Sequence, residues 1–145
     1  MEWAALIAWV ITAGGGFTLL ATWLRNGGMQ QQDQPGRRIR PPLILSHFGL
    51  AAIGLVVWII YVASDSDTLA WIAFVILLPV AGLGFTMLAL WIQRRQAATA
   101  PAPVAANGSA EPAEQRFPVP IVVLHGLLAV TTLVLVLLTA AGVGD

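Results

Sequence analysis

The chain has 145 residues, of which 58% are hydrophobic and 10% are charged, and seven basic residues balance seven acidic ones. With a mean hydropathy of +0.82, this composition excludes an ordinary soluble domain and predicts an integral membrane protein. The sequence contains no cysteine, which excludes disulfides, thiolate metal sites and thiol redox chemistry.

Four apolar stretches contain no Asp, Glu, Lys or Arg. They are 3–24, 43–63, 69–93 and 119–143. Each is long enough for the roughly 20 residues that a helix needs to cross about 30 Å of hydrocarbon. Because the backbone must satisfy its own hydrogen bonds in lipid, such stretches are predicted to be helices and not barrel strands. The predicted fold class is all-α, a four-helix transmembrane bundle that forms a single domain over 1–145.

The first stretch occupies the position of a secretory signal peptide. It opens with Glu2, however, lacks a basic segment ahead of the apolar run and has no clear Ala-x-Ala cleavage site. Its second half also returns later in the chain, since GGGFTLLATW from Gly14 matches GLGFTMLALW from Gly82. A segment that is duplicated inside the bundle is structural, so we expect the first span to stay in the mature protein.

The second and fourth stretches repeat each other in the same way. PLILSHFGLA from Pro42 matches PIVVLHGLLA from Pro120. The chain is therefore predicted to be a tandem repeat of two helical hairpins, 3–63 and 69–143. Because a two-helix unit enters the membrane in the same sense each time, a pseudo-twofold axis along the membrane normal is expected to relate the copies.

The basic residues follow the first and third spans and are all arginines. They are Arg25, Arg37, Arg38, Arg40, Arg94, Arg95 and Arg116. The positive-inside rule predicts that these two connections are cytoplasmic and that both termini lie outside, with a bacterial plasma membrane as the expected location. The second connection, 96–116, is rich in Ala and Pro and is predicted to be a flexible linker.

The two histidines of the chain, His47 and His125, occupy equivalent repeat positions. Both are predicted to lie roughly 7 to 10 Å inside the cytoplasmic end of their spans and to face the bundle axis. In an up-down-up-down bundle their helices are diagonal, with axes roughly 11 to 14 Å apart, a gap that we expect to be too wide for the rings to touch. The gap suits a flat group whose central metal takes a nitrogen from each side at about 2 Å. One haem b meets this description.

Small residues and arginines at similar depth complete the predicted cofactor site. Porphyrin is broad and rigid, so the helices at its edges must present little side chain, and glycine permits the closest approach. Haem propionates are anions that arginines and helix N-termini can bind. The residues predicted to bind the cofactor are His47 and His125 as metal ligands and, around them, Gly14, Gly16, Gly82, Gly84, Ala51, Ala129, Arg25, Arg40 and Arg94.

Other interpretations of these residues stay open. Two histidines in a bundle can instead bind a quinone, handle protons, or join helices by hydrogen bonds worth about 0.6 kcal/mol each, and glycines often serve helix packing alone. Met87 is a further axial candidate, although its repeat partner is Leu19. Structural zinc needs four ligands, and the spans contain no carboxylate or thiol. The sequence has no catalytic triad, phosphate-binding loop or nucleic-acid motif.

The four-helix core with His47 and His125 on its second and fourth helices resembles the small four-helix membrane b-type cytochromes related to the ascorbate-reducible family. The resemblance implies haem held between paired histidines and electron transfer, although that family has a second histidine pair that the first and third spans lack here. We therefore expect a single-haem cytochrome that exchanges electrons with a quinone or a respiratory redox partner and does no chemistry at the iron. A homodimer is also compatible with the sequence. The alternative is a cofactor-free accessory or scaffold subunit of a larger membrane complex.

Overall fold

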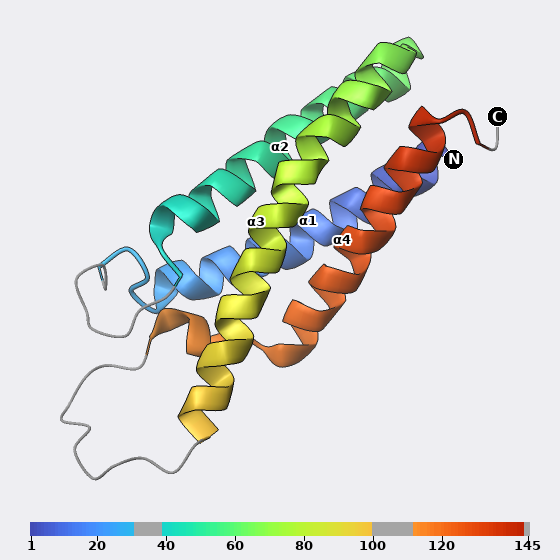
Figure 1. Ribbon diagram of the computed structural model, residues 1–145. Helices are drawn as coiled ribbons and strands as arrows, with labels where there is room; N and C mark the ends of the chain where they lie inside the picture. The colour runs from blue at the N-terminus through green and yellow to red at the C-terminus, as the bar shows by residue number, and fades with distance from the viewer. Residues whose placement is uncertain (31–38, 100–111, 144–145) are drawn as a thin grey trace, which may run out of the picture.

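The computed structural model describes residues 1–30, 39–99 and 112–143, which form four long helices and one short 3-10 helix (Figure 1). The elements are α1 (Glu2–Arg25), α2 (Pro41–Ser64), α3 (Asp67–Thr99), η1 (Ala113–Arg116) and α4 (Val119–Ala140). All four α-helices are long and apolar enough to cross a membrane. The predicted all-α bundle is confirmed, and the chain has the spans of a multi-pass integral membrane protein.

The helix ends differ from the predicted spans in ways that local chemistry explains. Helix α2 begins at Pro41, because a proline in the first turn loses no intrahelical hydrogen bond. It ends at Ser64, and the C-cap residue Asp65 adopts the left-handed conformation with φ 53°. Helix α3 continues through the arginines to Thr99, beyond the apolar stretch that predicted it. Hydropathy therefore located the membrane-crossing part of each helix and not its full length.

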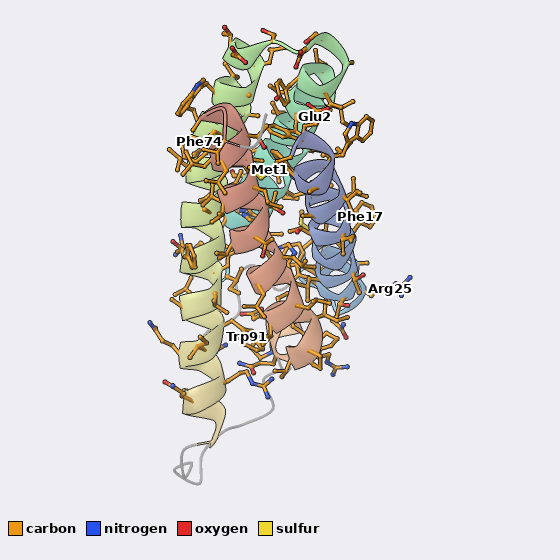
Figure 2. The ribbon with its side chains drawn as sticks, turned by 90° about the vertical axis from the view of Figure 1, so that its right-hand side faces the viewer. Met1, Glu2, Phe17, Arg25, Phe74 and Trp91 are labelled. Atoms are coloured by element: carbon orange, nitrogen blue, oxygen red, sulfur yellow. The ribbon has the colours of Figure 1, made fainter. Side chains whose placement is uncertain are left out.

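Helix α1 packs along α4, and α2 packs along α3, while the α1–α2 and α3–α4 contacts are sparser (Figure 1). Within the described ranges no close backbone contact joins α1 to α3 or α2 to α4, so these pairs are diagonal. Met1 and Glu2 lie at the end where α2 turns into α3, and Arg25 and Trp91 lie toward the other end (Figure 2). We call this second end, which includes Arg40, the arginine end.

Positions that recur every seven residues line the bundle axis. They are 9, 16 and 23 on α1, 47, 54 and 61 on α2, 70, 77, 84 and 91 on α3, and 125, 132 and 139 on α4. A seven-residue repeat is the pattern of helices that pack at shallow angles. Every one of these residues is buried except Gly16, His47, Gly84 and His125, which are partly exposed. These four residues form one layer, the histidine–glycine layer, and it is the most loosely packed of the series.

The arginine end has its own hydrophobic cluster, and η1 belongs to it. Trp23 and Trp91, which are repeat partners, pack there with Ile39, Ile44 and Ala113. Ala113 is fully buried, and the short helix that it begins contacts α1 and α3. The predicted flexible linker 96–116 is therefore folded at both ends, since α3 reaches Thr99 and η1 packs on the bundle.

Glycines terminate α1 next to this cluster. Gly27, with φ 78°, stands where only glycine is unstrained. The Gly28 N–H donates to the Trp23 carbonyl (2.9 Å) and the Gly27 N–H to the Leu24 carbonyl (3.1 Å), which is the hydrogen-bond pattern of a Schellman motif. This turn lays the Gly28 backbone directly against the indole ring of Trp23.

The substitution Gly28→Ala is expected to destabilise the bundle. A Cβ at this position would overlap the Trp23 ring, which is fully buried and cannot move aside. Overpacking of this kind costs about 1–3 kcal/mol or more, and it would be measured as a lower midpoint of thermal unfolding in detergent. Gly126→Ala is the control, because a Cβ there meets nothing within 4 Å and the helix gains about 0.5–1 kcal/mol of propensity. Equal midpoints for the two variants would contradict this account.

Candidate functional site

The histidine–glycine layer holds both histidines of the chain. His47 on α2 bonds through Nδ1 to the Val80 carbonyl of α3 at 3.0 Å, and His125 on α4 bonds through Nδ1 to the Thr12 carbonyl of α1 at 2.9 Å. Thr12 and Val80 are equivalent repeat positions, so the predicted pseudo-twofold relation holds at this site. Because a carbonyl only accepts, each Nδ1 carries its proton and each Nε2 keeps a lone pair.

The two imidazole rings face each other across the bundle. Their centroids lie 6.3 Å apart, and their planes are inclined by 67°. The expectation that the gap would be too wide for contact is wrong, because this is the distance of an edge-to-face ring pair. Hydrogen bonding of Nδ1 to a backbone carbonyl is also the usual outer-sphere arrangement of a metal-ligating histidine. The geometry therefore suits two roles, direct ring packing and ligation of a metal between the rings.

Gly16 and Gly84 make room for the rings. A Cβ on Gly16 would lie 3.0 Å from Cε1 of His125, and a Cβ on Gly84 would lie 3.2 Å from Cε1 of His47. Gly15 also borders His125, with its Cβ position 3.5 Å from the Cβ of that histidine. Each histidine therefore occupies the space that a glycine opens on the neighbouring helix.

The other two predicted glycines are not at the site. Gly14 and Gly82 are exposed on the outer surface, and a Cβ on either would meet nothing within 4 Å. Residues two apart on a helix differ by about 200° in direction, so Gly14 and Gly16 cannot both face the axis. The structure thus separates the repeated glycines into an inner pair beside the histidines and an outer pair, Gly14 and Gly82, whose Cβ positions face open space and not the predicted site.

Beyond the histidines, toward the chain termini, the bundle is filled. Ala51 and Ala129 follow the histidines by one turn and are partly buried, as the predicted small face requires. One turn further, the ring of Trp9 lies 3.1 Å from the Cβ position of Gly54. On the other side, the buried hydroxyls of Thr12 and Thr132 pair at 3.3 Å. These contacts leave no room for a flat group on the terminal side of the histidine layer.

The three predicted anion-binding arginines differ in burial. Arg25 and Arg40 are exposed, and Arg25 points away from the bundle in Figure 2. Arg94 is partly buried, and its Nε is buried without a hydrogen-bond partner. Of the three, Arg94 alone brings a donor atom into the interior.

A surface pocket of about 490 Å³ lies between α2 and α3 at the arginine end, and it was not among the predicted sites. Its lining residues are Arg40, Pro42, Leu43, Ser46 and Leu83. One pattern does mark it, because Arg40 and Ser46 are polar where the second repeat has Pro118 and Leu124. The pocket is open, and Ser46 precedes His47 in the chain.

No group of three or more His, Asp or Glu side chains that could hold a metal ion occurs within residues 1–30, 39–99 and 112–143. The described side chains thus offer two imidazoles and not the four ligands of a structural zinc site. Comparison of the chain with protein-family models, with curated proteins and with solved structures finds no match.

Proposed function

We propose that this chain is a membrane b-type cytochrome that holds one haem between His47 and His125 and transfers electrons. The separation of the two imidazole rings carries the proposal. A metal–nitrogen bond of about 2.0 Å on each side, with each nitrogen about 1.1 Å from the centre of a ring built of bonds near 1.3 Å, sets the ring centres about 6.2 Å apart. The separation in the structure is 6.3 Å.

The chemistry of the donors supports the same group. Each Nδ1 is occupied by a backbone carbonyl, so each ring has one nitrogen lone pair, at Nε2, left to bind a metal. Two imidazoles do not complete the coordination of a metal, so its other donors would have to come from a group that is not part of the protein. A porphyrin supplies four nitrogens in one plane. Gly16 and Gly84 place no side chain against the imidazole rings, and the layer is partly exposed where its neighbours along the bundle axis are buried.

Electron transfer follows from the ligand set. A bound haem would supply an iron that accepts and releases one electron. With an imidazole on each side, the iron would have no open position for a substrate. An enzyme acting at the iron is therefore disfavoured. The arginine end would be cytoplasmic under the positive-inside rule, in a bacterial plasma membrane. A quinone or another respiratory redox partner would exchange the electron.

A cofactor-free accessory or scaffold subunit is the second candidate. The observation that favours it is the edge-to-face orientation of the rings, with planes inclined by 67° and each ring seated against a glycine. Such a layer would lock the register of the helices through packing and two hydrogen bonds.

Colour separates the two candidates. Protein purified from haem-replete cells is expected to be red and to carry about one haem per chain, with a Soret band that shifts and sharpens on dithionite reduction. Absorbance spectra of the oxidised and reduced protein, with haem extracted and quantified against protein, provide the measurement. A colourless preparation from cells that load a control cytochrome would favour the accessory role.

A further inference from the structure

Buried polar atoms without a hydrogen-bond partner gather at the arginine end. Within the described residues they are Nε1 of Trp23, Nε of Arg94 and Oε1 of Glu114. Trp23 is fully buried and Glu114 is 1% exposed. A buried polar group without a partner is costly and rare in native proteins. These three atoms are the described buried side-chain groups that still need a polar partner.

The three atoms belong to residues in or next to the hydrophobic cluster of the arginine end. Trp23 of α1 packs in the same buried group as Trp91 of α3 and Ala113 of η1. The Trp91 indole N–H donates to the Glu114 carbonyl oxygen at 3.1 Å, which fixes η1 against α3. Arg94 follows Trp91 by one helical turn and so lies on the same side of α3. Because η1 contacts both α1 and α3, it spans the end of the space between these two diagonal helices.

This cluster lies directly beyond the histidine–glycine layer. Trp23 and Trp91 follow Gly16 and Gly84 by seven residues, which is two turns along the same helix face, or about 10 Å. The bundle is filled on the other side of the layer by Trp9 and the threonine pair. A flat group held by the histidines would therefore extend toward the three unpartnered atoms.

The atoms also define the chemistry of what they bind. The Trp23 and Arg94 nitrogens are N–H donors, and Arg94 adds a positive charge, so together they suit a carboxylate. The Glu114 oxygen accepts, so it suits the O–H of a carboxylic acid. A porphyrin edge with two propionic acid groups, one ionised and one protonated, supplies both partners.

We propose that Trp23, Arg94 and Glu114 form the subsite for the two propionic acid groups of the haem. This inference rests on the proposed function and adds the orientation of the cofactor, with its acid edge toward η1. It assigns the anion contact to Arg94, whereas Arg25 and Arg40 remain exposed at the surface.

The test compares haemin with haemin dimethyl ester, which has the same ring without the acid groups. Apoprotein in detergent is titrated with each, and affinity is read from the Soret absorbance. Wild-type protein is expected to prefer haemin by about tenfold or more. Arg94→Gln is expected to lose most of this preference, and the matched control Arg25→Gln is expected to keep it. Trp23 lies in the core, so Trp23→Phe could also disturb folding. Its affinity for the dimethyl ester is the control, because a correctly folded variant must bind the ester as tightly as the wild-type protein does.

The outcomes separate this subsite from the proposed function. If neither porphyrin binds wild-type protein, the cytochrome proposal fails, and the subsite falls with it. If both porphyrins bind with equal affinity, or if Arg94→Gln keeps the full preference for haemin, the subsite is wrong while the cytochrome stands. Loss of the preference in Arg94→Gln with unchanged ester affinity supports the subsite.

Discussion

Replacing either His47 or His125 with alanine is expected to abolish the haem spectrum. The two rings approach from opposite sides, on α2 and α4, so neither histidine can take over the role of the other. Loss of a partner that only orients a metal ligand costs 10–100-fold in affinity, and loss of the ligand itself is expected to cost at least this much. The measurement is the ratio of Soret to protein absorbance after purification, with extracted haem as a second quantity.

Neighbouring residues that face outward provide the controls for this experiment. Phe48 is 38% exposed and Leu124 is 56% exposed, and each adjoins one histidine in the chain. Phe48→Ala and Leu124→Ala are expected to keep the wild-type spectrum. Adding imidazole to His47→Gly or His125→Gly is expected to restore part of the absorbance, since the small ring can enter the vacated space. An alanine variant at either histidine that retained the full spectrum would refute the ligand assignment.

The sequence predicts the membrane spans and the placement of the histidines because both depend on local or repeated patterns. Uniform hydropathy marks each span, and the repeat equates His47 with His125 at one depth. Which helices pack most closely is a long-range property that neither pattern encodes. The hairpins that form the repeat units are loosely packed within themselves, and the close pairs α1–α4 and α2–α3 join the two halves.

The predicted gap between the rings is too wide for a geometric reason. The distance between diagonal helix axes ignores the inward reach of each imidazole, which brings the centroids to 6.3 Å. The sequence predicts all four glycines at the site because the repeat aligns Gly14 with Gly82 as well as it aligns Gly16 with Gly84. Only the seven-residue spacing from Trp9 through Gly16 to Trp23 distinguishes the inner position from the outer one.

The folding of η1 could not be predicted from composition. Its Ala- and Pro-rich surroundings are typical of a linker, and no apolar periodicity marks Ala113–Arg116. The segment folds because the Trp91 indole N–H, buried at the end of the bundle, finds an acceptor in the Glu114 carbonyl. A single long-range hydrogen bond of this kind leaves no pattern in the sequence.

Enlarging the inner glycines is expected to close the site. In Gly16→Leu the new Cβ would stand 3.0 Å from Cε1 of His125, and in Gly84→Leu it would stand 3.2 Å from Cε1 of His47. The rest of each leucine must then push the imidazole out of the layer or occupy the space between the diagonal helices. Haem content is expected to fall by tenfold or more, as for loss of a ligand, and overpacking is expected to lower stability by about 1–3 kcal/mol. Extracted haem per protein and the thermal midpoint measure the two effects.

The outer glycines make this experiment specific to position. Gly14→Leu and Gly82→Leu add the same side chain to the same helices, two residues away, where a Cβ meets nothing within 4 Å. Leucine is favoured over glycine within a helix by somewhat less than about 1 kcal/mol, so these variants are expected to keep their haem and to be at least as stable as the wild type. Equal haem loss from inner and outer variants would mean that glycine serves helix flexibility in both places. Loss confined to Gly16 and Gly84 would tie the two glycines to the space around the histidines, because helix propensity, hydropathy and chain position are matched between the pairs.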